Sequence, residues 1–140
     1  MADLTVTAAS VLASAAATNV RNGIAGETLT AGMPVYVDTA DGNSLKKAQA
    51  TSAKHACVGI TTSAAADGQP IAYTASDTSF AIGSTVVVGT VYCVSATAGG
   101  ICPLVDLVSP DYVTVLGVAN TTSTIVLVAS AAVRAGAGIA

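Results

Sequence analysis

His55 and Cys57 are the two residues in this chain whose types and spacing could support catalysis. They stand two residues apart at the start of a predicted β-strand, 56–61, so their side chains point to the same face. A histidine that takes the proton of a nearby thiol turns the cysteine into a nucleophile. No third group that would orient the imidazole is identifiable. A small cysteine enzyme is therefore kept only as a rival hypothesis.

Metal binding is the second kind of chemistry to consider. Asp38 and Asp41 bracket a turn and could hold Ca²⁺ together with backbone oxygens, but they lack the spacing and number of acids of a calcium loop. One histidine and scattered cysteines cannot complete a four-ligand zinc site without a second chain. We therefore expect solvated turn carboxylates, with no metal and no cofactor.

The three cysteines, Cys57, Cys93 and Cys102, are an odd number at irregular spacing. This pattern argues against the disulfide framework of a secreted protein. The favoured interpretation is three buried, reduced thiols that act as small hydrophobic residues. Cys93 and Cys102 flank a predicted hairpin, so a cross-strand disulfide is the alternative.

Two further motifs are weak. Gly136-Ala137-Gly138 resembles part of a phosphate-binding loop, but the sequence ends before a helix could follow it. Asn120-Thr121-Thr122 matches a glycosylation acceptor, which has no meaning without secretion. We assign no catalytic, cofactor or metal residue and expect no small-molecule substrate, so the chain is not predicted to be an enzyme.

The charge content is unusually low. Only 9% of the 140 residues are charged, against about 25% in ordinary soluble domains, while 52% are hydrophobic. Much of the surface is therefore expected to contact other protein. The five cations form no stripe, which argues against nucleic acid, and no apolar run approaches a membrane helix. The first charge of the N-terminus is negative, which does not indicate a signal peptide.

Short runs rich in Val, Ile, Thr and Tyr dominate the sequence after residue 24. The turn signals between them are Asp41-Gly42, Asp67-Gly68 and Gly99-Gly100. This texture predicts an all-β fold, a compact β-sandwich or β-barrel of short antiparallel strands. The predicted strands cover 34–38, 56–61, 71–74, 91–95, 101–105, 112–119 and 124–128.

The two ends differ from the middle in composition. Residues 1–20 are rich in Ala, Ser and Thr, which leaves an extended arm, an edge strand and a helix open. We expect residues 2–18 to order by docking on a partner rather than by building the core. Residues 21–129 form the predicted β domain, and 130–140 form a flexible tail or a second arm.

The β domain carries an internal echo at a shift of about 57 residues. Residues 26–32 align with 83–89, and 57–60 align with 115–118. Two pseudo-repeats at about 24–62 and 81–119 are the interpretation, with chance similarity as the alternative. Gly32 and Gly89 hold matching places before a strand, which predicts a positive φ at both.

Four segments carry a resemblance to a known family. They are 26–38, 68–71, 89–101 and 112–119. The chain resembles, over roughly 4–128, the capsid decoration (cement) proteins of tailed bacteriophages and related head-fibre proteins. That family consists of compact β domains that commonly form trimers on the outside of the capsid.

The resemblance implies a structural virion protein. It would form a homotrimer and bind the major capsid protein on the capsid exterior, after synthesis in the host cytoplasm. The alternative within virion proteins is a head-fibre or tail-appendage subunit for host attachment. Such a role should show exposed aromatic residues, and only Phe80 and four tyrosines are available.

Overall fold

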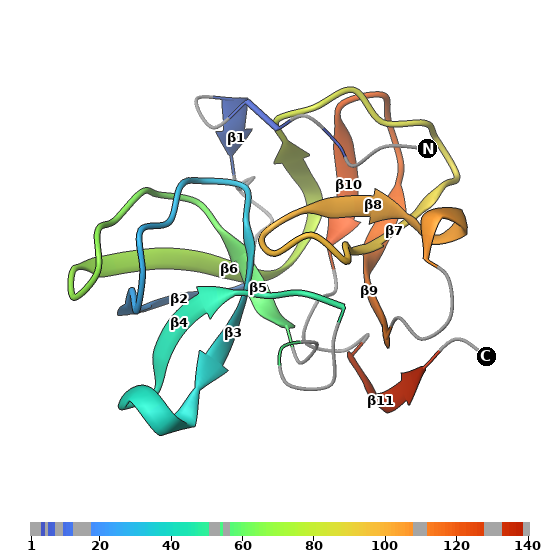
Figure 1. The fold of residues 1–140 in the computed structure, drawn as a ribbon. Helices are drawn as coiled ribbons and strands as arrows, with labels where there is room; N and C mark the ends of the chain where they lie inside the picture. The colour runs from blue at the N-terminus through green and yellow to red at the C-terminus, as the bar shows by residue number, and fades with distance from the viewer. Residues whose placement is uncertain are drawn as a thin grey trace.

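The computed structural model describes residues 4, 6–7, 10–12, 18–50, 54, 57–107, 112–127 and 133–138. The all-β prediction is confirmed: 52% of the chain is strand, and a curled antiparallel sheet forms a half-barrel (Figure 1). The strands are β1 (Val11–Leu12), β2 (Thr18–Ile24), β3 (Pro34–Asp38), β4 (Ser44–Lys47), β5 (Cys57–Thr61), β6 (Pro70–Ile82), β7 (Val91–Val94), β8 (Ile101–Pro103), β9 (Tyr112–Ala119), β10 (Thr124–Leu127) and β11 (Val133–Gly138). Two short 3₁₀ turns, η2 (Thr39–Asp41) and η3 (Leu104–Asp106), follow β3 and β8.

The strand order is β4-β3-β5-β6-β10-β9-β7-β8, with β1 and β2 also paired to β6 and β11 paired to β9. β6 runs for 13 residues and is the long strand that joins the two sides of the sheet (Figure 1). Its first half pairs with β2 and β5, and its second half pairs with β1 and β10. The expectation of only short strands therefore does not hold for β6.

The sheet consists of two units with matching connections. The first unit is β2 to β5 with the first half of β6, and the second unit is the second half of β6 with β7 to β10. In each unit a hairpin (β3–β4 or β7–β8) pairs through its first strand with the next strand, β5 or β9. Both of those pairings shift register, at Val35/Tyr36 and at Tyr92/Cys93, so the sequence echo has a counterpart in the strand pairing.

Two pairs of glycines hold equivalent places in the units. Gly32 and Gly89 have φ of 89° and 84°, which confirms the predicted positive φ at both. A methyl group on Gly59 would lie 2.6 Å from the Thr74 carbonyl oxygen, and one on Gly117 would overlap the Val126 carbonyl oxygen. Glycine therefore lets β5 approach β6, and β9 approach β10, at the same point in each unit.

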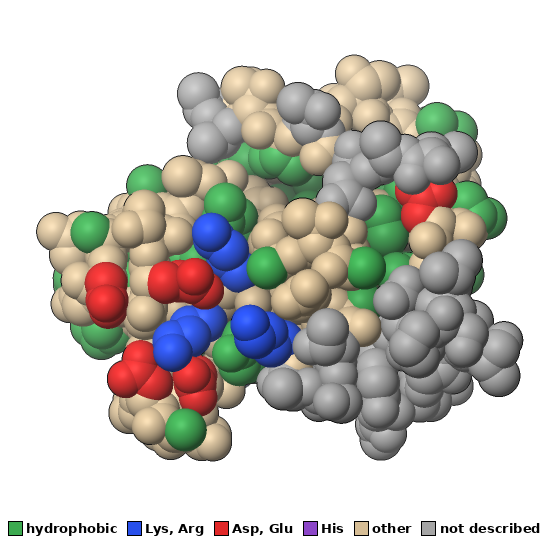
Figure 2. All heavy atoms as spheres, in the orientation of Figure 1, with side chains coloured by type: hydrophobic (Ala, Val, Ile, Leu, Met, Phe, Trp, Pro, Cys, Tyr) green, Lys and Arg blue, Asp and Glu red, His purple; other side chains and the backbone are tan. Residues whose placement is uncertain are grey.

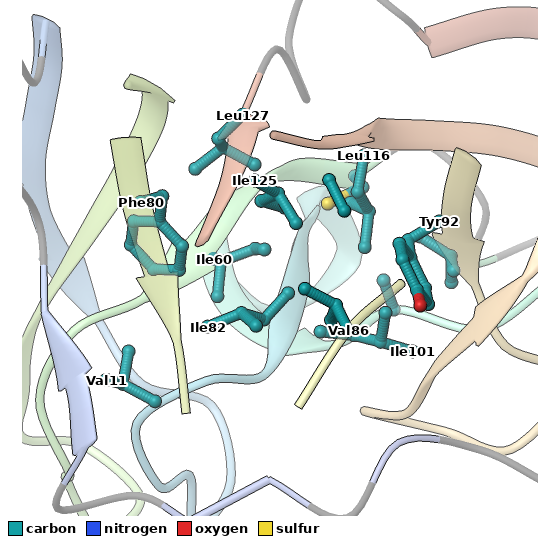
Figure 3. Close-up of a cluster of buried hydrophobic side chains, with 14 residues drawn as sticks. Val11, Ile60, Phe80, Ile82, Val86, Tyr92, Ile101, Leu116, Ile125 and Leu127 are labelled. Carbon is teal, nitrogen blue, oxygen red and sulfur yellow. The ribbon is translucent and has the colours of Figure 1, made fainter. Parts of the chain in front are cut away.

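The main core joins both units and includes Ile60 from β5 as well as Phe80 from β6 (Figure 3). Its side chains point toward one another from β1, β5, β6, β7, β8, β9 and β10. A second core fills the first unit alone, around Leu29, Leu45 and Ile71.

The expectation that the N-terminal segment stands apart from the core is wrong. Val11 is buried in the main core, and Leu4 and Val6 pack against it. The Leu4 N–H donates to the Ile101 carbonyl at 2.8 Å, and the Thr7 N–H donates to the Gly83 carbonyl at 2.7 Å. Apolar residues in this segment fill a place between β6 and β8, so the edge-strand alternative fits best.

Both predicted boundaries of the β domain also need correction. β2 begins at Thr18, inside the segment 1–20 that was expected to precede the domain. β11 pairs with β9, so residues 133–138 are part of a sheet rather than a flexible tail.

Candidate interaction surface

The Cys57 thiol is not set up as a nucleophile. Its side chain is buried on β5, and burial raises its pKa to about 12. The Sγ–H group donates to the Gly59 carbonyl at 3.2 Å. The thiol is therefore protonated at neutral pH, whereas a nucleophilic cysteine needs the thiolate. His55, the other member of the predicted dyad, lies outside the described residues.

Cys93 and Cys102 lie opposite each other on β7 and β8. Both are buried, and neither is in a disulfide, so the disulfide alternative is not what the structure contains. They pack with Ala50 and Leu107 in a small apolar cluster. Burial raises the pKa of Cys93 to about 12, which agrees with a packing role.

The acids Asp38 and Asp41 lie around a lysine rather than an open cation site. Lys46 Nζ is 2.8 Å from Asp38 Oδ2 and 3.3 Å from Asp41 Oδ2. The hydrogen bond from Lys46 lowers the pKa of Asp38, and Ser44 donates to Asp41 at 3.0 Å. Within the described ranges, no group of three or more His, Cys, Asp or Glu side chains could hold a metal ion.

The two weak motifs have ordinary surroundings. Gly136 and Gly138 lie in β11. Asn120 Nδ2 donates to the Thr78 carbonyl at 3.0 Å, and its Oδ1 accepts from Thr124 Oγ1 at 2.6 Å. The Asn120 side chain is therefore part of the hydrogen-bonded turn between β9 and β10.

Charge is distributed unevenly over the described chain. The first unit carries Arg21, Glu27, Asp38, Asp41, Lys46, Lys47, Lys54 and Asp67. Residues 78–107 and 112–127 carry a single charged side chain, Asp106. Figure 2 shows acidic and basic groups gathered over the β3–β4 side, and one isolated acid on the opposite side among hydrophobic side chains.

A row of aliphatic side chains crosses the second unit on the face away from the main core. Val118 on β9 lies directly opposite Val91 on β7 and Val126 on β10. Tyr92 pairs with Pro103 in the antiparallel β7–β8 hairpin, so the next residue, Leu104, lies beside Val91. Directly opposite residues of an antiparallel pair share a face, so these four side chains form one continuous row.

In this row Val118 and Leu104 are exposed, while Val91 and Val126 are partly buried. Three exposed aliphatic residues border the row. Val87, Val88 and Val105 are 66%, 57% and 76% exposed. The Val87 N–H donates to the Tyr92 hydroxyl at 3.0 Å, and the Gly89 N–H donates to the Ala119 carbonyl at 2.8 Å, which fixes this loop beside β7 and β9. We call the seven residues Val87, Val88, Val91, Leu104, Val105, Val118 and Val126 the valine face.

Sequence reasoning did not identify the valine face. The available signal was the run Val86-Val87-Val88 in a stretch that has almost no charge. Val86 is buried whereas Val87 and Val88 are both exposed in the turn before β7, so strand alternation does not describe this run. The rest of the face depends on strand register, which joins residues far apart in sequence.

Comparisons with known proteins add no relative: no family model, no curated protein and no solved structure matches this chain. Among the described residues, no helix is long and apolar enough to cross a membrane.

Proposed function

We propose that this chain is a structural virion protein that decorates the outer surface of a bacteriophage capsid and stabilises the lattice of its major capsid protein. The observation that carries the proposal is the valine face, a partly exposed aliphatic surface in a unit whose described charged residues are Asp106 and the buried Asp77. The family resemblance supplies the biological setting. The buried, protonated thiols of Cys57 and Cys93 support a binding role over thiol chemistry.

The valine face is best suited to contact between copies of the chain. Permanent interfaces within homo-oligomers are more apolar than interfaces that form transiently. A decoration protein has to stay soluble before it meets a capsid, and a large exposed apolar face promotes aggregation. A homotrimer that covers this face before attachment satisfies both requirements.

The attachment test uses purified protein and expanded, empty phage heads. We expect co-sedimentation with heads at a saturating ratio of three chains per site, and a higher melting temperature of the heads. Unexpanded heads are the control, because decoration follows expansion in the family that the sequence resembles. Absence of binding to heads of the phage that encodes the chain would reject the proposed function.

The copy–copy contact has a separate test. Light scattering on the free protein should give about three times the chain mass of 13.5 kDa. Val88→Asp places a charge on the valine face in an exposed loop and should yield monomer. Thr39→Asp, exposed on the charged side, is the matched control and should remain a trimer. A wild-type monomer would reject the role assigned to the valine face.

A further inference from the structure

A second surface feature is a hollow of about 600 Å³ at the end of β6. This size lies in the usual range of small-molecule sites, about 300–1,000 Å³. Ala81 and Gly83 are among its lining residues, and five hydroxyl side chains complete the lining: Thr7, Ser10, Ser84, Thr85 and Ser123. Three chain segments thus meet here: the N-terminal segment, the end of β6 and the β9–β10 turn.

The hydroxyl groups of the hollow are not used by the protein itself. Within the described part of the chain, none of the five makes a side-chain hydrogen bond. Hydroxyl groups elsewhere do: Thr61 donates to the Thr30 carbonyl at 2.7 Å, and Thr121 Oγ1 accepts from the Thr124 N–H at 3.0 Å. Five unused donors that are also acceptors therefore surround one hollow.

The lining restricts the chemistry of a ligand. Among the described residues that line it, none supplies a cationic side chain for an anion, a carboxylate for a cation or an aromatic ring for stacking. It offers neutral donors and acceptors around the small residues Ala81 and Gly83. A small uncharged molecule with many hydroxyl groups matches this lining, since each ligand hydroxyl can both donate and accept.

We propose that this hollow is a binding site for a neutral saccharide unit. The hydroxyl groups of the sugar would bond to the five side chains, while its C–H face would rest near Ala81 and Gly83. Without an aromatic platform, each site binds weakly. If the proposed function holds, many copies lie on one particle, and multivalency raises the apparent affinity.

The test is an NMR titration of the ¹⁵N-labelled full chain with methyl glucoside, methyl galactoside and N-acetylglucosamine. At least one sugar should shift the amide signals of residues 84, 85 and 123, with a dissociation constant on the order of 1–10 mM. Glucosamine and gluconate, which carry charge, should shift these signals less. No shift with any neutral sugar at about 50 mM would overturn the proposal.

The variant Ser84→Ala/Thr85→Val removes two hydroxyl groups with little change in volume. We expect binding about tenfold weaker, since each lost hydrogen bond reduces affinity severalfold. Thr39→Val removes an exposed hydroxyl on the charged side and should bind like the wild type. Equal affinity in both variants would overturn the site. The double variant should bind phage heads as the wild type does. If the wild type binds sugar but does not bind heads, the proposed function is rejected and the saccharide site is not.

Discussion

The outer edges of β4 and β8 hold matching places in the two units but are closed differently. At β4 the same unit supplies the cover: the Gly26 N–H donates to the Leu45 carbonyl at 2.8 Å, and the Lys47 N–H donates to Glu27 Oε2 at 2.8 Å. At β8 the cover comes from outside the unit, where the Leu4 N–H donates to the Ile101 carbonyl. An open strand edge invites pairing with other chains, so both units need a cover.

The two units also differ in the residues on their outer surfaces. The first unit carries a lysine–aspartate cluster and most of the described charge, whereas the second carries the valine face. One strand arrangement thus carries two different kinds of surface in one chain. The first unit therefore has the more polar surface, and the second unit has the more apolar surface, which we propose to contact other copies of the chain.

Deleting residues 1–12 should have the largest effect. Burial of Val11 together with the partial burial of Leu4 and Val6 is worth about 4 kcal/mol, so the free energy of unfolding should fall by roughly that amount. Glu27→Ala, which uncovers one N–H at the β4 edge, should cost only about 1 kcal/mol. Urea unfolding of both variants measures the difference. Unchanged stability after the deletion would show that the segment is an arm after all.

Gly59→Ala and Gly117→Ala should come next. Each methyl group would press against a backbone carbonyl oxygen of the neighbouring strand, and backbone cannot move aside as a side chain can. We expect losses of about 1–3 kcal/mol, with Gly117→Ala the larger because its overlap is deeper. Val58→Ala, a partly buried neighbour, is the control for strand position. If both glycine variants unfold like the control, the equivalence of the two close approaches fails.

Gly32→Ala and Gly89→Ala test whether the N-terminal segment makes the two equivalent glycine sites differ in stability. Both glycines have a positive φ, which costs alanine about 1 kcal/mol. A methyl group on Gly32 would also lie 2.5 Å from Val6 and 2.9 Å from Val11, whereas one on Gly89 meets open space. Gly32→Ala should therefore lose about 1 kcal/mol more than Gly89→Ala in denaturant unfolding.

The same pair in the protein without residues 1–12 completes a double-mutant cycle. The two alanine variants should then lose equal stability, because Val6 and Val11 are gone and only φ remains. A difference that persists would place its cause outside the N-terminal segment.

Local signals could predict the hairpins, the turns and the positive φ of Gly32 and Gly89. Asp41-Gly42 and Gly99-Gly100 mark turns by themselves, because glycine tolerates φ values that other residues avoid. The place of Val11 could not be predicted, since an Ala- and Ser-rich segment has no hydrophobic period and its position depends on distant β6 and β8. The valine face and the hydroxyl hollow likewise depend on strand register between remote segments.

The smallest effect concerns the charged unit, at the Asp38–Lys46 pair. The hydrogen bond from Lys46 lowers the pKa of Asp38 below its ordinary value of 3.8. A depressed carboxyl pKa contributes stability at pH values above the ordinary pKa, and this contribution is lost as the pH falls through the folded-state pKa.

Both groups are solvent-accessible, so the effect should be small and should weaken further in high salt. Lys46→Met should therefore be slightly less stable than the wild type at pH 7, and the gap should close below about pH 4. Lys47→Met, whose backbone rather than ammonium group makes the contact with Glu27, is the matched control and should show no such pH dependence. A gap for Lys46→Met that stays constant from pH 7 to pH 3 would mean that its methylene packing, and not its charge, stabilises the β3–β4 hairpin.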